Sequence, residues 1–69
     1  MDYESEQFEA DYWQGVLVIT DKATGQCGNV MLHDSKGRNI TLRQLRSGIK
    51  THGVERALAT FAKLVTEWH

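Results

Sequence analysis

Apolar residues in the first half of the chain predict a β-hairpin. The segment YWQGVLVIT contains four consecutive β-favouring residues, Val16 to Ile19, which follow Gly15 and precede the turn-forming stretch DKATGQ. A second short apolar run, CGNVMLH, ends at DSKGRN, which is rich in turn formers. Two strands joined by a short loop are expected to pair antiparallel, and a third short strand is expected over residues 38–40.

A helical period begins after this hairpin. Leu42, Leu45 and Ile49 recur at the spacing that places side chains on one side of a helix, which predicts a helix over residues 42–51. A second set of apolar residues repeats at helical spacing and predicts another helix from Val54 to about Glu67. Its members are Val54, Leu58, Phe61, Val65 and Trp68.

Local signals mark both ends of the first helix. Thr41 is expected to be the N-cap, with Gln44 as the return partner of a capping box. Ile40 and Leu45 occupy the positions of a hydrophobic staple. Gly53 is expected to take the left-handed conformation that ends helices.

The order of these elements predicts an α+β fold. A small antiparallel β-hairpin or three-stranded meander over residues 12–40 should be followed by two α-helices that pack on it. With 69 residues the chain is expected to form one domain over residues 1–69. A domain of this size buries only about 60% of the surface of its unfolded chain, so a homodimer is a natural way to complete the core.

Composition narrows the class of protein. An apolar content of 41% and a charged content of 25% are ordinary for a folded domain. The single cysteine, Cys27, has no partner for an intrachain disulfide and favours a reducing compartment. The longest apolar runs are far shorter than a membrane span, and residues 1–13 are acidic where a signal peptide is basic. We therefore expect a cytoplasmic protein with no membrane partner.

Charge is distributed unevenly along the chain, although the net charge is only −1. Residues 1–11 hold five acids and no base, whereas residues 36–69 hold seven bases and two acids. Such a split is typical of an interaction segment at one end and an anion-binding surface at the other. It is equally typical of two ends that neutralise each other.

The acidic N-terminal stretch is a candidate for binding a protein partner. Aromatic side chains would supply contact area, and carboxylates would steer the approach of a basic surface or imitate a phosphate strand. The alternatives are a frayed, solubilising terminus over residues 1–11 or a short edge element. The candidate contact residues are Asp2, Tyr3, Glu4, Glu6, Phe8, Glu9, Asp11 and Tyr12.

A basic stripe offers a competing function, namely phosphate-directed binding of nucleic acid. The second helix is a poor reader of base edges, because it offers as many acids as bases and no asparagine or glutamine. The alternative is that the stripe simply keeps one side of the first helix in water. The candidate residues are Lys36, Arg38, Arg43, Arg46 and Lys50.

Catalytic and metal sites find little support. Cys27, His33, His52 and His69 match no common zinc spacing, and no motif places a nucleophile beside a base. We expect no metal, no cofactor and no catalytic residue. The large residues Trp13, Phe61 and Trp68 are expected to lie in the core or to cap it, and any that stay exposed would form a contact patch.

The sequence therefore predicts a small non-enzymatic protein–protein interaction module, which would act as an accessory or inhibitory protein by occupying a partner's surface. Phosphate-directed nucleic-acid binding is the alternative.

Overall fold

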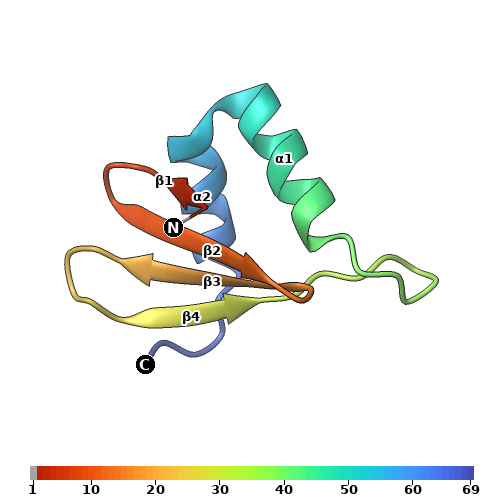
Figure 1. The fold of residues 1–69 in the computed structure, drawn as a ribbon, viewed down its shortest axis with the longest axis horizontal. Helices are drawn as coiled ribbons and strands as arrows, with labels where there is room; N and C mark the ends of the chain where they lie inside the picture. The colour runs from red at the N-terminus through yellow and green to blue at the C-terminus, as the bar shows by residue number, and fades with distance from the viewer. Residues whose placement is uncertain (1) are drawn as a thin grey trace.

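The computed structural model describes residues 2–69. Four strands come first and two helices follow, which confirms the predicted α+β fold with one strand more than the predicted three-stranded meander (Figure 1). The strands are β1 (Tyr3–Glu4), β2 (Phe8–Trp13), β3 (Val16–Asp21) and β4 (Cys27–Val30), and the helices are α1 (Thr41–His52) and α2 (Val54–Ala62).

The sheet is an antiparallel meander with the strand order β1-β2-β3-β4. Strands β2 and β3 are joined by Gln14 and Gly15, whose φ angles are 46° and 87°. Positive φ at both central residues is the signature of the tight turn that matches the twist of paired strands. Because Trp13 pairs with Val16, this turn fixes the register of the whole β2–β3 ladder.

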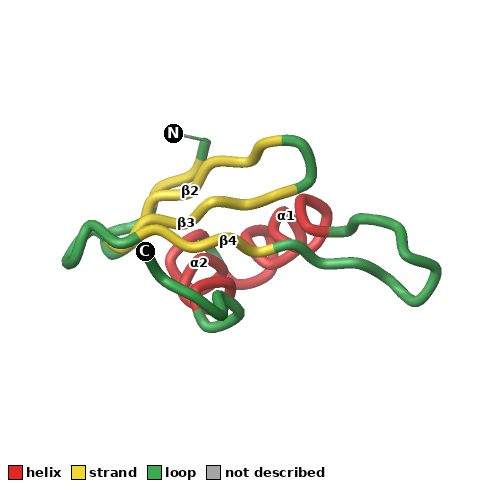
Figure 2. The backbone as a smooth tube through the Cα atoms, turned by 90° about the horizontal axis from the view of Figure 1, so that it is seen from below, coloured by secondary structure: helices red, strands yellow, loops and turns green. Residues whose placement is uncertain are grey.

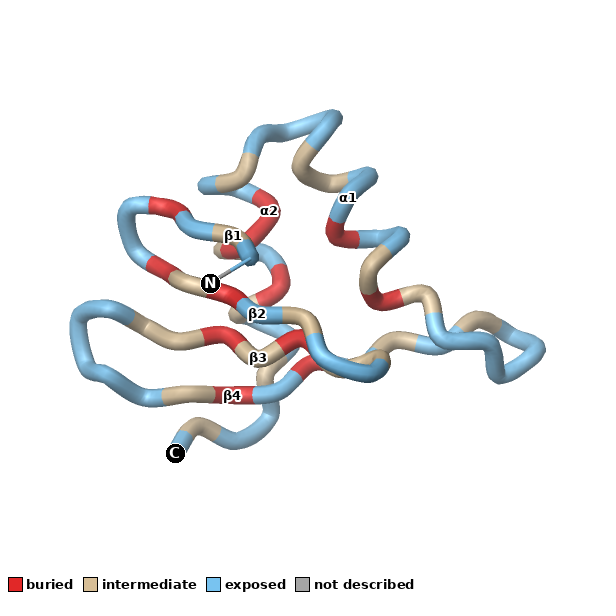
Figure 3. Tube along the Cα trace, viewed as in Figure 1, coloured by how far each residue is buried: buried red, intermediate tan, exposed pale blue. Residues whose placement is uncertain are grey.

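Both helices lie on the same side of the sheet (Figure 2). The core lies between these two layers, where alternate residues of the strands are buried (Figure 3). Leu17, Ile19, Leu45 and Leu58 are each fully buried. Phe8, Ala10, Val30, Ala57 and Phe61 complete the core.

The N-terminal segment is not a frayed end. Residues 3–4 form the edge strand β1, and residues 8–11 belong to β2, an inner strand. Two aspartates fasten this edge: the backbone N–H of Asp2 donates to Asp11 Oδ1 at 2.9 Å, and the N–H of Tyr12 donates to Asp2 Oδ2 at 2.8 Å. Strand β1 is therefore the expected short edge element, and β2 is a further strand that lies beside it.

Residues 38–40 do not form the expected third strand. The chain from His33 to Asn39 instead folds back on itself as a turn, with a single bridge between these two residues. The carboxylate of Asp34 accepts the backbone N–H groups of Lys36 and Arg38, each at 2.9 Å. A side chain that satisfies its own loop competes with extension of a ladder.

Helix α1 begins as predicted within one residue, but its capping box is absent. The Oγ1 of Thr41 accepts the backbone N–H of Leu32 at 2.8 Å, and the N-cap residue is Ile40, whose side chain cannot cap the helix. The first N–H of the helix, that of Thr41, donates to Asn39 Oδ1 at 3.0 Å. Thr41 is fully buried, so its hydroxyl ties the helix to the chain that leaves β4. Gly53 joins the two helices with the expected positive φ, 89°, but its ψ of 160° lies outside the left-handed helical region that was predicted.

Helix α2 ends at Ala62, earlier than the predicted Glu67. Beyond it the chain turns back towards β4, where the backbone N–H and C=O of His69 pair with Cys27 at 2.8 and 2.9 Å. Gly28 leaves room for this path, because a Cβ on it would lie 2.2 Å from Val65 Cγ1. Val65 and Trp68 thus reach the core from a returning segment rather than from the helix.

Candidate functional site

Within residues 2–69, both helices lie on one face of the sheet, and we refer to the opposite face, which carries no helix, as the uncovered face. Successive side chains of a strand point to opposite sides, so the partners of the buried residues define this face. On β2, the core residues Phe8 and Ala10 and the half-buried Tyr12 lie on the side of the helices. Glu9, Asp11 and Trp13 alternate with them and lie on the uncovered face. Its strand residues are Glu4, Glu9, Asp11, Trp13, Val16, Val18, Thr20, Cys27 and Asn29. Met31 follows β4 and is exposed between Val30 and Leu32, which both pack in or against the core, so we assign it to the same face.

An apolar row crosses one end of the uncovered face. Trp13 pairs with Val16 across β2 and β3, and Met31 follows the buried Val30 at the end of β4. Trp13 is 71% exposed and Met31 51% exposed, while Val16 and the neighbouring Val18 are half-buried. The expectation that Trp13 lies in the core or caps it is therefore wrong. Large exposed apolar side chains gathered on one surface are typical of binding sites.

Carboxylates occupy the opposite end and the β1 edge of this face. Glu4 and Glu9 are direct cross-strand partners, a pairing of like charges that disfavours the sheet. Lys22 relieves it by forming an ion pair with Glu4. Asp11 lies between these acids and Trp13 along β2. Because successive same-face residues on a strand are about 7 Å apart, the acids and the indole form one continuous strip.

The predicted acidic aromatic segment is thus divided between two faces. Its acids Glu4, Glu9 and Asp11 lie on the uncovered face, whereas Phe8 is buried and Tyr3 and Tyr12 pack against the core. The aromatic contribution to the uncovered face comes from Trp13, which the predicted contact set did not include. The alternation of FEADYW, with Phe8, Ala10 and Tyr12 two residues apart, is the signal that would have found it.

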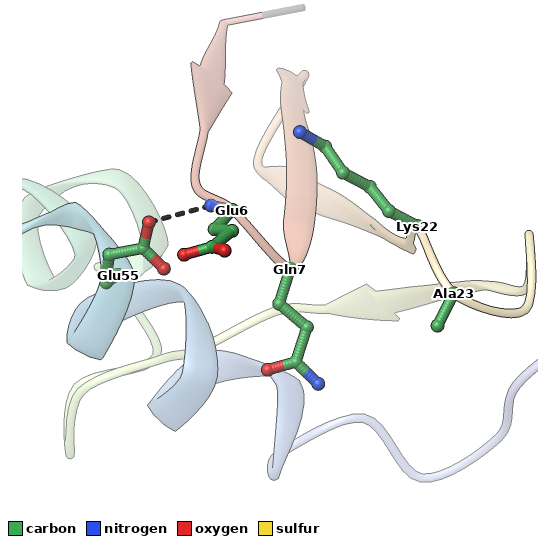
Figure 4. Close-up of a pocket in the computed structure, with 5 residues that line it drawn as sticks. All are labelled: Glu6, Gln7, Lys22, Ala23 and Glu55. Carbon is green, nitrogen blue, oxygen red and sulfur yellow. Dashed lines mark hydrogen bonds between the residues drawn. The ribbon is translucent and has the colours of Figure 1, made fainter.

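Glu6 lies in the turn between β1 and β2, away from the uncovered strip. Its backbone N–H donates to Glu55 Oε1 at 2.7 Å, which ties the turn to α2 (Figure 4). A surface depression of about 510 Å³ lies here, lined by Glu6, Gln7, Lys22, Ala23 and Glu55. Because Ala23 is the only apolar lining residue, this depression lacks the hydrophobic walls of a typical small-molecule site.

The predicted basic residues lie on the helix side of the molecule. Lys36 and Arg38 are on the loop before α1, and Arg43, Arg46 and Lys50 follow along the helix; all five are exposed. Arg38 forms an ion pair with Asp34 at 3.1 Å. Among the side chains that the structure describes, no ion pair joins the acids of residues 2–11 to the bases of α1.

Asp34 organises the loop electrostatically. The hydrogen bond from the backbone N–H of Arg38 is the main cause that lowers the pKa of Asp34, against partial desolvation that raises it. The N–H of Lys36, the guanidinium of Arg38 and the charge of Arg43 lower this pKa further. The loop and the first turns of α1 therefore share one electrostatic environment.

The described residues 2–69 contain no group of three or more histidine, cysteine, aspartate or glutamate side chains placed to hold a metal ion. Cys27 is a free, half-buried thiol whose Sγ lies 3.3 Å from Thr20 Oγ1. Over the same residues, neither helix is long and apolar enough to cross a membrane.

No protein-family model, curated protein or solved structure matches this chain.

Proposed function

We propose that this protein is a non-enzymatic interaction module that binds a basic surface of a protein partner through its uncovered face. One observation carries the proposal: Trp13 and Met31 are 71% and 51% exposed on the sheet face that no helix covers. Burying large side chains of this kind is the main source of affinity at protein interfaces. An accessory or inhibitory role follows if the surface it occupies is one the partner uses.

The acids of this face indicate the chemistry of the partner. Glu9 and Asp11 share one strand face with Trp13, so a partner that packs on the indole brings its neighbouring side chains over carboxylates. A lysine or arginine of the partner suits the positions over the carboxylates and also those beside the indole, because a cation stacks favourably on an indole ring. We therefore expect a basic surface with an apolar side chain at its centre.

The cellular setting belongs to the same proposal. The free thiol of Cys27 suits a reducing compartment, and we place the protein in the cytoplasm. A second copy of the chain is the competing occupant of the uncovered face. It would reveal itself as concentration-dependent sedimentation that disappears in Trp13→Ala.

The test uses a fluorescein-labelled peptide with two leucines flanked by lysines, titrated with the protein and followed by anisotropy. We expect binding that Trp13→Ala weakens at least tenfold. Leu64→Ala is the matched control, since Leu64 is also exposed, at 46%, but lies outside the sheet. The affinity of the Leu64→Ala variant for the peptide should stay within about twofold of that of the original protein, as for most substitutions away from an interface.

Charge reversal provides a second, independent pair of variants. Glu9→Lys should strongly weaken binding of the same peptide. Glu67→Lys, at an exposed position near the C-terminus, should change the affinity for the peptide little. A peptide with glutamates in place of the lysines should not bind. Equal effects of the two reversals, or equal effects of Trp13→Ala and Leu64→Ala, would contradict the proposal.

A further inference from the structure

The loop before α1 projects from the body of the molecule (Figure 1, green, at the right), and we call residues 33–39 the finger. Its two arms are held together by the bond from the backbone N–H of Asp34 to Arg38 O, at 2.9 Å. The N–H of Ile40 donates to Leu32 O at 2.9 Å and closes its base. Together with the Asp34 carboxylate, these bonds give the finger a defined shape.

The finger and α1 present five exposed cations and few balancing charges. Lys36 and Arg38 lie on the finger, and Arg43, Arg46 and Lys50 share one side of α1 at helical spacing. In residues 33–52, Asp34 is the only acid, and Arg38 pairs with it. Asp2 lies just before β1, and the other four acids of residues 2–11 belong to β1, β2 and the turn between them, not to the finger or α1.

The same surface lacks the anchors that protein partners use. The exposed large apolar residues are Trp13, Met31 and Leu64, and none lies in residues 33–52. Interfaces with nucleic acid are more polar and far more positive than those between proteins. Arginine and lysine without an aromatic or aliphatic anchor are therefore better suited to phosphates than to a folded protein surface.

The spacing of the helical cations also suits a nucleic-acid strand. Arg43 and Lys50 are seven residues apart, which is about 10 Å along the helix axis. Phosphates of one duplex strand advance about 3.4 Å per base pair, so this distance covers about three of them. The finger extends the row beyond the start of the helix.

We propose that the finger and the Arg43–Lys50 side of α1 bind the phosphate backbone of nucleic acid without reading its sequence. This inference goes beyond the proposed function, because it uses a different surface and a different ligand. If both hold, the protein joins a basic protein partner to nucleic acid through two different sets of residues.

The test is fluorescence anisotropy of labelled random-sequence duplex and single-stranded oligonucleotides, at low and at physiological salt. We expect binding at low salt. For five phosphate contacts, the logarithm of the binding constant should fall with the logarithm of salt concentration with a slope of about −4.5 for duplex and about −3.5 for single strands. The double variant Arg43→Ala with Arg46→Ala should bind at least tenfold more weakly, with a slope shallower by about two.

A matched double variant separates this surface from net charge. Arg56→Ala with Lys63→Ala removes two exposed cations outside the surface, and should bind within about twofold of the original protein. Circular dichroism melting confirms that both double variants fold. No binding at low salt, or equal losses in both double variants, would overturn the proposal.

Vesicles containing phosphatidylserine test the other anionic surface. Binding to these vesicles that is as tight as to the oligonucleotides, and equally sensitive to Arg43→Ala with Arg46→Ala, would overturn a nucleic-acid assignment in favour of a membrane surface. None of these outcomes depends on the uncovered face, so Trp13→Ala should bind oligonucleotides as the original protein does.

Discussion

The two faces of the sheet are built from the same strands, yet they have opposite physical roles. Towards the helices, Leu17 and Ile19 of β3 are fully buried; away from them, Val18 between them is only half-buried. A period of two residues thus separates side chains that stabilise the fold from side chains that are available to a partner. Apolar character alone therefore does not assign a residue to the core in a two-layer domain.

Shortening one side chain on each face should give the largest difference in stability between the two faces. Leu17→Ala should lower the free energy of unfolding by about 2–5 kcal/mol, because it leaves a cavity in a fully buried site. Val18→Ala should cost less than about 1 kcal/mol, since its cross-strand partners Asp11 and Asn29 are exposed to water. Urea unfolding measures both, and equal losses would mean that the two faces are equally packed.

A second substitution examines the helix side at β4. Gly28→Ala should destabilise the protein by about 1–3 kcal/mol, because the new Cβ would lie 2.2 Å from Val65 Cγ1. In a Val65→Ala background the same change should cost clearly less, since the clashing methyl group is gone. A cost that is unchanged in this background would show that the returning segment does not lie on Gly28.

A third substitution concerns the exposed end of the other face. Trp13→Ala should change the free energy of unfolding by no more than about 0.5 kcal/mol, because the side chain is 71% exposed. Thermal melting by circular dichroism measures this. A large loss of stability would return Trp13 to the core and remove the anchor of the proposed interface.

The smallest effect lies outside both faces, in the finger. The lowered pKa of Asp34 means that its ionised form stabilises the fold above the ordinary carboxyl pKa of 3.8, and that this contribution is lost as the pH falls through the lowered value. Asp34→Asn should therefore be slightly less stable than the original protein at pH 6, with the gap closing below about pH 4. Urea midpoints at several pH values measure it, and a gap that widens in acid would contradict this role.

Much of the helical half was predictable because its signals are local. The spacing of Leu42, Leu45 and Ile49 predicted α1 to within one residue at each end. The capping box failed because the hydroxyl of Thr41 is used by Leu32, a contact set by tertiary packing. Similarly, α2 stops early because the chain turns back to place Val65 on Gly28, which no local period reveals.

The N-terminal strands were harder to predict for a different reason. Acids alternate with the core-facing residues Phe8, Ala10 and Tyr12 of β2, so the strand contains no continuous apolar run. These three core-facing side chains are one small and two aromatic residues, and none is β-branched. The acids of the candidate site could be listed from the sequence. Their separation from the aromatics depends on strand register, which the tight turn at Gln14 and Gly15 sets.

Chemical-shift mapping by ¹H–¹⁵N NMR, with the unlabelled lysine–leucine peptide titrated into ¹⁵N-labelled protein, locates the interaction surface residue by residue. We expect shifts concentrated at Glu9, Asp11, Trp13, Val18 and Met31, with little change along α1 and the finger. Shifts centred on the helices, or spread evenly over the chain, would contradict the assignment of the uncovered face as the interaction surface.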